Sequence, residues 1–166
     1  MPLRVCLHLK SALLLRKSLM TRQFVNISNA RKGEYKKVIE NIARTGQCPF
    51  CPENFKYHKK PIYKTKGNWF LTNNSWPYKN TSQHLVIIGK KHKEKFEELT
   101  NKDFAEVSLL TSWAIKNFKI KGGSLNMRFG DTRFTGASVA HLHFHIISPK
   151  LNKKTQRAKV VDFHIG

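Results

Sequence analysis

Residues 141–147 read His-Leu-His-Phe-His-Ile-Ile, so histidine alternates with large apolar residues at a period of two. This is the period of a β-strand, whereas a helix would scatter the three histidines around its axis. A strand places the three imidazoles on one face and leaves Leu142, Phe144 and Ile146 to pack into a core on the other. Because desolvating three unpartnered imidazoles costs free energy, the pattern predicts a site that binds a metal, an anion or a reacting group.

The remaining pattern predicts an α+β domain with an antiparallel sheet. Apolar residues recur at helical spacing over 31–45, where Gly46 ends a short amphipathic helix. A longer helix, capped by Thr100 or Asn101, runs to about Phe118. Its predicted inward side chains are Phe104, Val107, Leu109, Leu110, Trp113 and Ala114. Short runs typical of strands lie at 61–64, 68–72, 84–88, 124–129 and 139–147, the last bounded by Pro149. We therefore expect a sheet of about five strands, a long central helix and a short N-terminal helix.

The charge of the chain is strongly positive, with 31 basic and 10 acidic residues and a net charge of +21. Residues 1–33 hold seven bases and no acid, and 149–166 hold five bases and one acid. The middle of the chain keeps 19 bases and 9 acids, so it is basic too. The balance predicts anionic partners such as nucleotides, phosphates or nucleic acid, although a lysine-rich, solvated surface would give the same counts.

The first 22 residues are basic, free of acid and rich in leucine. They resemble a mitochondrial transit peptide more than a secretory signal, since Arg16 and Lys17 follow a very short leucine run. Met20 as the true start is a third interpretation. No apolar run approaches the length of about 20 residues that a membrane span needs. We expect a cytoplasmic protein, or one of the mitochondrial matrix if residues 1–22 are a transit peptide.

Three cysteines are too few for a disulfide framework: Cys48 and Cys51 form a Cys-x-x-Cys pair and Cys6 is left over. This fits a reducing compartment and a metal or redox role. A zinc site would need two more ligands, for which the available histidines are His58, His84, His92, His141, His143 and His145. A redox role is disfavoured because no βαβ pattern surrounds the pair. Two reduced cysteines in a turn remain an alternative.

The histidine row itself allows three interpretations. A neutral imidazole can attack phosphorus while a second imidazolium holds or protonates a phosphate oxygen. Three alternating histidines can instead chelate a catalytic zinc that activates water, or simply form a satisfied, partly exposed face. The preceding loop, Gly136 to Ala140, offers backbone N–H groups and the Ser138 hydroxyl to an anion. It is otherwise an ordinary glycine turn.

The stretch 136–147, Gly-Ala-Ser-Val-Ala-His-Leu-His-Phe-His-Ile-Ile, resembles the signature of the histidine triad (HIT) family of nucleotide hydrolases and transferases. Upstream, residues 84–92 (His-Leu-Val-Ile-Ile-Gly-Lys-Lys-His) are similar to the strand and turn before that family's central helix. Asn126 falls where the family carries an asparagine on the strand preceding the signature. The resemblance covers roughly residues 47–148 and implies a HIT-like fold.

The resemblance also implies roles for individual residues. His143 would be the nucleophile on the α-phosphorus, forming a nucleotidyl-histidine that water then cleaves. His145 would contact the phosphate and help the leaving group. Ser138 and the backbone around Gly136 would hold phosphate oxygens, with Asn126 assisting.

Zinc-containing relatives, including the related galactose-1-phosphate uridylyltransferase, join a Cys-x-x-Cys and two histidines on one zinc. The matching set in this chain is Cys48, Cys51, His92 and His141, which implies a structural Zn²⁺ in a closed tetrahedral site. His84 would then orient the triad without binding the metal. Zinc on His141 would place positive charge near His143 and disfavour its imidazolium form.

Two departures from the family pattern bear on the substrate. The family often has glutamine where Ala137 stands, which leaves substrate identity open. The uridylyltransferases have glutamine at the third histidine position, so His145 favours hydrolysis over transfer to a sugar phosphate. We expect a nucleotidyl hydrolase of phosphoramidates or dinucleoside polyphosphates, acting as a homodimer that pairs two sheets into one. Apolar residues of the early strands, with Ile62, Phe70 and Leu71 as candidates, would contact the base.

Three rival functions remain open at this point: deadenylation of nucleic-acid ends, a non-catalytic zinc-stapled module that binds RNA or other nucleic acid, and a hydrolase with catalytic zinc on the triad itself. The first is weakened because no separate zinc finger follows the triad. The predicted layout is a basic extension over 1–22, a helical segment over 23–46, a HIT-like catalytic domain over 47–148 and a basic tail over 149–166.

Overall fold

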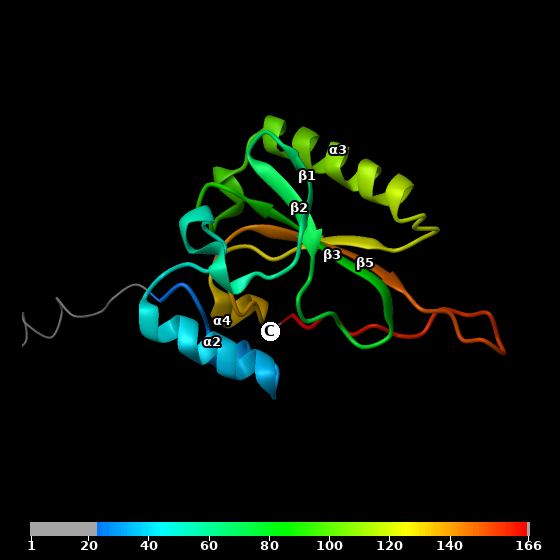
Figure 1. The fold of residues 1–166 in the computed structure, drawn as a ribbon, viewed down its shortest axis with the longest axis horizontal. Coiled ribbons are helices and arrows are strands. Elements are labelled where there is room, and N and C mark those ends of the chain that lie inside the picture. Colours follow the sequence, from blue (N-terminus) through cyan, green and yellow to red (C-terminus); the bar gives the residue numbers. More distant parts are fainter. Residues whose placement is uncertain (1–22, 166) are drawn as a thin grey trace, which may run out of the picture.

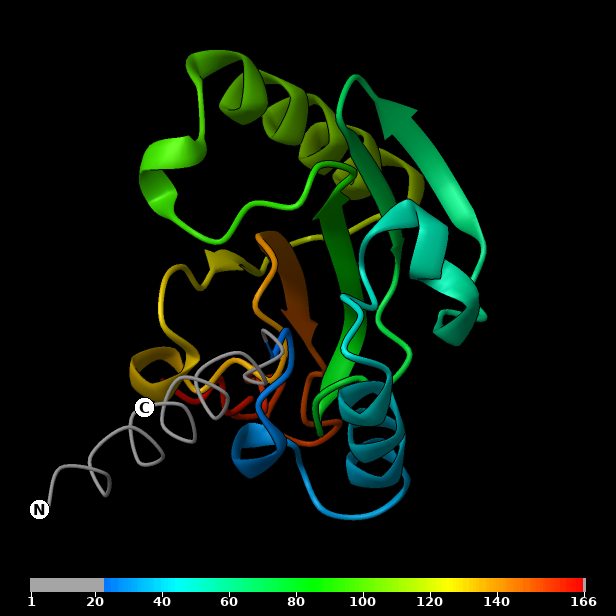
Figure 2. The same ribbon diagram turned by 90° about the vertical axis from the view of Figure 1, so that its left-hand side faces the viewer.

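The computed structural model describes residues 23–165, so the predictions made for residues 1–22 lie outside the described part of the chain. Its centre is a five-stranded antiparallel sheet in the order β1-β2-β3-β5-β4. Helix α3 (Asn101–Asn117) covers one side of the sheet and α2 (Glu34–Thr45) lies on the other (Figures 1 and 2). The strands are β1 (Ile62–Lys66), β2 (Trp69–Asn73), β3 (Thr81–Gly89), β4 (Ser124–Met127) and β5 (His143–Pro149). The predicted α+β class is confirmed.

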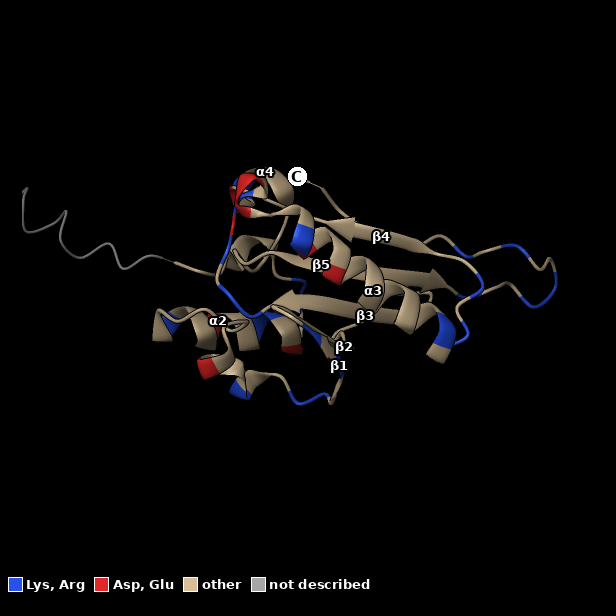
Figure 3. Ribbon diagram, turned by 90° about the horizontal axis from the view of Figure 1, so that it is seen from above, with Lys and Arg blue, Asp and Glu red and all other residues tan. Residues whose placement is uncertain are grey.

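Four short helical segments complete the structure: η1 (Ile27–Asn29), η2 (Pro52–Tyr57), η3 (Phe96–Glu98) and α4 (Thr132–Thr135). None of the helices within residues 23–165 has the length and apolar character to cross a membrane. Lys and Arg residues lie in the loops at the end of the sheet where α3 stops and the chain leaves β5 (Figure 3).

The alternation along β5 divides its side chains between two environments, as the sequence predicts. Phe144 and Ile146 face α3 and pack with buried side chains of that helix, including Val107 and Leu110. In the register with β3, His145 pairs with Val86 and His143 with Ile88, so these residues share the opposite face. The apolar row therefore makes the core, and the imidazoles face α2.

The two long helices begin and end where local chemistry directs them. Thr100 accepts a hydrogen bond from the backbone N–H of Asp103, and the Asp103 carboxylate accepts one from the N–H of Thr100, which forms a capping box at the start of α3. Helix α2 ends at Gly46, whose φ of 63° is the left-handed conformation that favours glycine.

Two expectations about these elements are wrong in detail. The histidine strand starts at His143 and not at residue 139, because His141 turns away to the end of β3, where its Nε2 donates to the Gly89 carbonyl. On α3, Phe104 and Leu109 are 39% and 55% exposed, because the buried stripe follows Val107, Leu110 and Ala114.

Candidate functional site

The face of β5 that carries the histidines forms one wall of a cavity of about 130 Å³. Helix α2 and the chain before η2 close it from the other side. Side chains from segments far apart in the sequence meet there. The lining includes Asn29, Arg31, Tyr35, Val38, Ile39, Ile42, Phe50, Tyr57, Ser75, Tyr78, Arg128, Gly136, Ser138, His143, His145 and His164. We call this cavity the histidine pocket.

His143 is held in one tautomer by the backbone. Its Nδ1 lies 2.6 Å from the carbonyl oxygen of His141, and a carbonyl oxygen can only accept. Nδ1 therefore carries the proton, and Nε2 keeps a free lone pair. Burial lowers the pKa of His143 to about 4, so the ring is neutral near pH 7. The Phe50 ring packs edge-on against it, with centroids 5.0 Å apart.

His145 is held in the opposite tautomer by a chain of hydrogen bonds. The backbone N–H of Tyr78 donates to His84 Nδ1 at 3.0 Å, so the proton of a neutral His84 is on Nε2. His84 Nε2 lies 3.0 Å from His145 Nδ1, to which it donates, and 3.1 Å from Asn74 Nδ2. The proton of His145 is then on Nε2. Burial lowers the pKa of His84 to about 3 and holds the pKa of His145 well below its usual value.

Two buried polar side-chain atoms among residues 23–165 have no hydrogen-bond partner, and both belong to residues lining the histidine pocket. One is His145 Nε2 and the other is Ser75 Oγ. Leaving such atoms unpaired costs about 1–3 kcal/mol each. The pocket therefore presents a donor, His145 Nε2–H, and a hydroxyl to a polar ligand.

The predicted phosphate-side residues are only partly brought together. Gly136 and Ser138 line the histidine pocket, and the Ser138 hydroxyl is hydrogen-bonded to the Tyr35 hydroxyl of α2. Asn126 pairs with His145 in the β4–β5 register. Its side-chain amide donates a hydrogen bond to the Ser124 hydroxyl, however, and the residue does not line the pocket. Arg128, two residues further along the same face, does line it.

Sequence reasoning missed two arginines at this site. Arg128 stacks on the Phe163 ring at 3.9 Å and donates to the His164 carbonyl. Arg31 lies over the Tyr78 ring at 4.9 Å. Neither arginine forms an ion pair with a carboxylate of residues 23–165. Arg128 lies two residues after Asn126, so the strand period could have placed it on the same face. Nothing in the sequence places Arg31 near the triad.

The predicted base contacts are largely wrong. Leu71 is fully buried (0% exposed) in the core beneath α3, on the far side of the sheet from the histidines. Phe70 is on the histidine side but, like the exposed Ile62, does not line the pocket. The apolar lining comes instead from α2, with Val38, Ile39 and Ile42, because that helix crosses the histidine face. Its helical stripe was visible in the sequence but was not assigned to a ligand.

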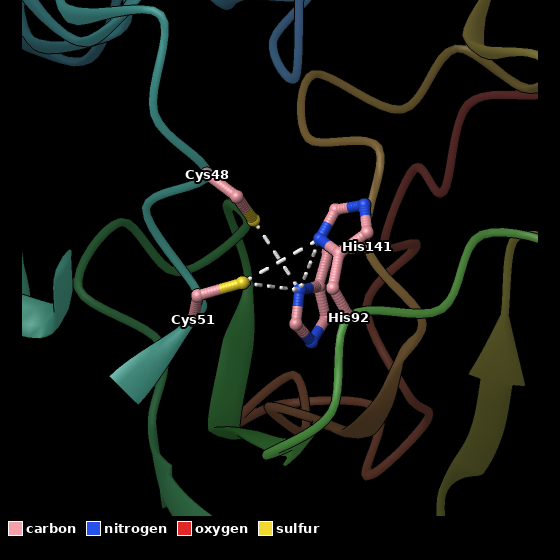
Figure 4. A group of neighbouring side chains, drawn as sticks. All are labelled: Cys48, Cys51, His92 and His141. Carbon is pink, nitrogen blue, oxygen red and sulfur yellow. Dashed lines mark hydrogen bonds between the residues drawn. The ribbon is translucent and has the colours of Figure 1, made fainter. Parts of the chain in front are cut away.

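A cluster of four possible metal ligands lies just before β5 (Figure 4). Its members are Cys48, Cys51, His92 and His141. Their four ligand atoms all lie within 4.8 Å of one another, and both cysteines are free thiols. The separations are 3.3 Å from Cys48 Sγ to His141 Nδ1, 3.5 Å from Cys51 Sγ to His92 Nδ1, and 3.2 Å between the two Nδ1 atoms. A tetrahedral zinc with ordinary bond lengths needs ligand separations of about 3.3–3.8 Å.

The protonation of the two imidazoles supports a metal at this point. His141 Nε2 donates to the Gly89 carbonyl at 2.7 Å, and His92 Nε2 donates to the Glu94 carboxylate at 2.8 Å. When both rings are neutral, their Nδ1 atoms direct lone pairs at each other, an arrangement that a bound cation satisfies. Without a cation, burial raises the pKa of the Cys48 thiol to about 12. The four residues therefore fit a closed Cys₂His₂ zinc site, the ligand set that the family resemblance implies.

Comparison with known proteins finds relatives of this domain. A family model described as the HIT domain matches residues 54–152. An uncharacterized HIT-like protein of Chlamydia trachomatis is 36% identical over 67 residues, which span 39% of this chain and 60% of that protein, less than two thirds of its length.

Two solved structures show the same fold at low sequence identity. A histidine triad nucleotide-binding protein from Candida albicans has a TM-score of 0.54 and 18% identity, covering 72% of this chain and 86% of that one. A hypothetical histidine triad nucleotide-binding protein from Sulfolobus tokodaii has a TM-score of 0.51 and 24% identity, covering 64% of this chain and 71% of that one.

Proposed function

The chain belongs to the HIT family, and from this premise we propose that it is a nucleotide hydrolase. Its substrate is a nucleoside phosphoramidate or a dinucleoside polyphosphate, from which it releases a nucleoside monophosphate through a covalent intermediate on His143. The observation that carries the proposal is the pair of opposite tautomers. His143 Nε2 has a free lone pair, whereas His145 Nε2 carries a proton and has no partner.

The first step follows from these two nitrogens. His143 Nε2 attacks the α-phosphorus, an N–P bond forms, and the bond from phosphorus to the leaving group breaks. His145 Nε2–H donates a hydrogen bond to the leaving-group atom, which takes its proton from solvent as it departs. His84 keeps His145 in the tautomer that has this N–H to donate.

The second step releases the nucleotide. Water attacks the phosphorus of the nucleotidyl-His143 and loses a proton to solvent, while His145 Nε2–H donates a hydrogen bond to a phosphate oxygen. The N–P bond breaks and the nucleoside monophosphate leaves. Both histidine rings are then neutral again.

The remaining lining residues suit the parts of a nucleotide. Arg128, Ser138 and the backbone around Gly136 supply donors for phosphate oxygens. The apolar side chains of α2, together with Phe50 and Tyr57, offer a surface for the base. Asn126 would bind a phosphate oxygen only if its side-chain amide gave up its hydrogen bond to the Ser124 hydroxyl.

A structural zinc ion is part of this proposal. Cys48, Cys51, His92 and His141 would hold it, and its chemical contribution is to fix these four side chains in one geometry. Catalytic zinc on all three triad histidines is not supported, because the Nδ1 of His141 faces the cysteines while the Nδ1 of His143 faces a carbonyl.

We also propose that two copies pair through β4. Within residues 23–165 this strand pairs with β5 alone, so its outer edge is free. Exposed apolar side chains lie nearby, including Phe96 and Phe129, whose ring centroids are 5.4 Å apart, and Leu125. A free edge beside apolar surface favours pairing with a second chain. A monomeric mass in light scattering at micromolar concentration would contradict the pairing.

A substrate panel tests the hydrolase. Adenosine phosphoramidate, diadenosine tetraphosphate, a UDP-sugar and adenylated DNA are each incubated with the wild type and with His143→Ala, and nucleoside monophosphate is measured. We expect release from one of the first two and a loss of about 1,000-fold or more in the variant. No turnover on any substrate would refute the proposal, and turnover of adenylated DNA alone would replace it with deadenylation.

A further inference from the structure

A second depression, larger than the histidine pocket, lies at one end of the sheet. The loops at this end carry Lys and Arg residues (Figure 3). It has a volume of about 1060 Å³, and its floor is formed by the chain from Gly122 to Ser124 and by the end of β5. We call it the lysine groove. Five lysines from two distant segments line it: Lys119, Lys121, Lys150, Lys153 and Lys159.

The charge of the lysine groove is unbalanced. No Asp or Glu lines it, and none of its five lysines forms an ion pair within residues 23–165. Lys154 and Arg157 add two more positive charges in the same tail, and Asp162 is its one acidic residue. Like charges held around one depression repel each other, and a polyanion bound there relieves the repulsion.

Backbone hydrogen bonds hold the outer wall of the groove in place. After β5 the chain folds back on itself, with the N–H of Lys159 donating to the Lys150 carbonyl at 2.8 Å. Asn80 ties both ends of this turn to the body of the protein, because its carbonyl accepts from Lys150 N–H and its amide donates to the Val160 carbonyl. The groove is therefore part of the folded domain.

The lysine groove leads to the histidine pocket through one aromatic residue. Phe163 lines the groove, and its ring lies 5.5 Å from the His145 ring and 3.9 Å from the Arg128 guanidinium. The next residue, His164, lines the histidine pocket. A second aromatic side chain, Phe118, lines the groove further away.

We infer that the lysine groove binds single-stranded nucleic acid, with one end of the strand directed toward the histidine pocket. A basic groove follows the phosphates of a single strand, and aromatic side chains stack with its bases. The binding itself does not depend on the proposed hydrolase, since none of the five lysines lines the histidine pocket.

Fluorescence anisotropy with a labelled single-stranded oligothymidylate tests the inference on the full chain. The variant Lys121→Glu/Lys153→Glu/Lys159→Glu reverses three charges in the groove. The control Lys37→Glu/Lys64→Glu/Lys102→Glu makes the same charge change at exposed positions outside it. Circular dichroism and turnover of a small nucleotide substrate show whether both proteins are folded.

We expect the groove variant to lose about tenfold or more in affinity at 100 mM salt, with a salt dependence shallower by about two units, since each phosphate contact on a single strand contributes about −0.7. The control should lose far less. Phe163→Ala should weaken binding more than Phe163→Leu at unchanged salt dependence.

Three results would overturn the inference: no binding by the wild type, equal losses in the two triple variants, or tighter binding of duplex DNA or inorganic polyphosphate than of the single strand. None of these results bears on turnover of small substrates, so failure of the groove and failure of the hydrolase are distinguishable.

Discussion

The Nδ1 atom of His143 lies 2.6 Å from the backbone carbonyl oxygen of His141, so the proposed nucleophile takes its tautomer from a proposed metal ligand. The His141 ring is in turn fixed between the Gly89 carbonyl and Cys48. A metal on Cys48, Cys51, His92 and His141 would therefore set the backbone from which His143 is oriented. This connection is why the structural site and the phosphate site share one segment of chain.

Replacing His84 should impair the hydrogen bond from His145 to the leaving group more than it impairs phosphate binding. In His84→Leu nothing donates to His145 Nδ1, and we expect kcat to fall about 10–100-fold for a substrate with a poor leaving group. A nucleotide with a p-nitrophenolate leaving group needs little protonation and should be nearly unaffected. His84→Gln, whose amide can donate in place of Nε2–H, should restore part of the loss. Equal losses for both leaving groups would contradict the positioning role.

Removing a cysteine should remove the metal. Zinc bound by purified wild type, measured by plasma mass spectrometry, should approach one ion per chain, and Cys48→Ser should lose most of it. The melting temperature should fall in the same variant, because a structural metal stabilises the fold it joins. Ser28→Ala is the control for handling and should keep its metal. Retention of zinc by Cys48→Ser would contradict the assigned ligand set.

The pH dependence of stability should contain a contribution from Asp103. This carboxylate is 4% exposed and accepts from Lys93 Nζ and Trp69 Nε1, each at 2.9 Å. Although burial opposes it, these hydrogen bonds hold the pKa of Asp103 well below its usual value. The stabilisation is present above the unfolded pKa of about 3.9 and is lost as pH falls toward the folded pKa.

Asp103→Asn should therefore lower the free energy of unfolding by about 3 kcal/mol near pH 7. The difference from the wild type should shrink as the pH is lowered below about 4. Denaturant titrations at pH 7 and at acidic pH measure this difference. A gap between the two proteins that stayed constant with pH would contradict the ionised carboxylate.

Substituting Gly122 and Gly123 in turn should show whether glycine is needed here for lack of space or only for the turn. A Cβ on Gly123 would lie 2.3 Å from the Ile147 carbonyl oxygen of β5, whereas a Cβ on Gly122 would meet nothing within 4 Å. We expect Gly123→Ala to cost about 1–3 kcal/mol and Gly122→Ala to stay within about 0.5 kcal/mol. Equal losses of unfolding free energy for the two substitutions in urea would contradict a steric role for the close approach of Gly123 to the Ile147 carbonyl.

Local periodicity was enough to predict much of the fold. The alternation in β5 and the helical stripe of α3 are short-range patterns, and the elements they predict are present. The sequence could not show that the strand begins only at His143. The position of His141 outside the strand depends on a hydrogen bond to the Gly89 carbonyl, which is distant in sequence. The exposure of Leu109 and the burial of Leu71 beneath α3 also depend on which elements pack together, and local periodicity does not show this.

The site shows the same division. Cys48, Cys51, His92 and His141 were grouped by resemblance, and the fold brings their ligand atoms together. Arg31, by contrast, carries no motif and reaches the histidine pocket only because α2 and the chain before it cross the histidine face. Residues that act through tertiary placement, and not through a local pattern, were the ones missed.

The central claim is that His143 becomes covalently nucleotidylated. A substrate that is turned over is mixed with the enzyme, the reaction is stopped by acid-free denaturation within milliseconds to seconds, and the intact mass and the peptide masses are measured. We predict a mass increase of one nucleoside monophosphate group, located on His143 and absent from His143→Ala. Steady turnover with no adduct on the wild type at any time, or an adduct on another residue, would contradict the account.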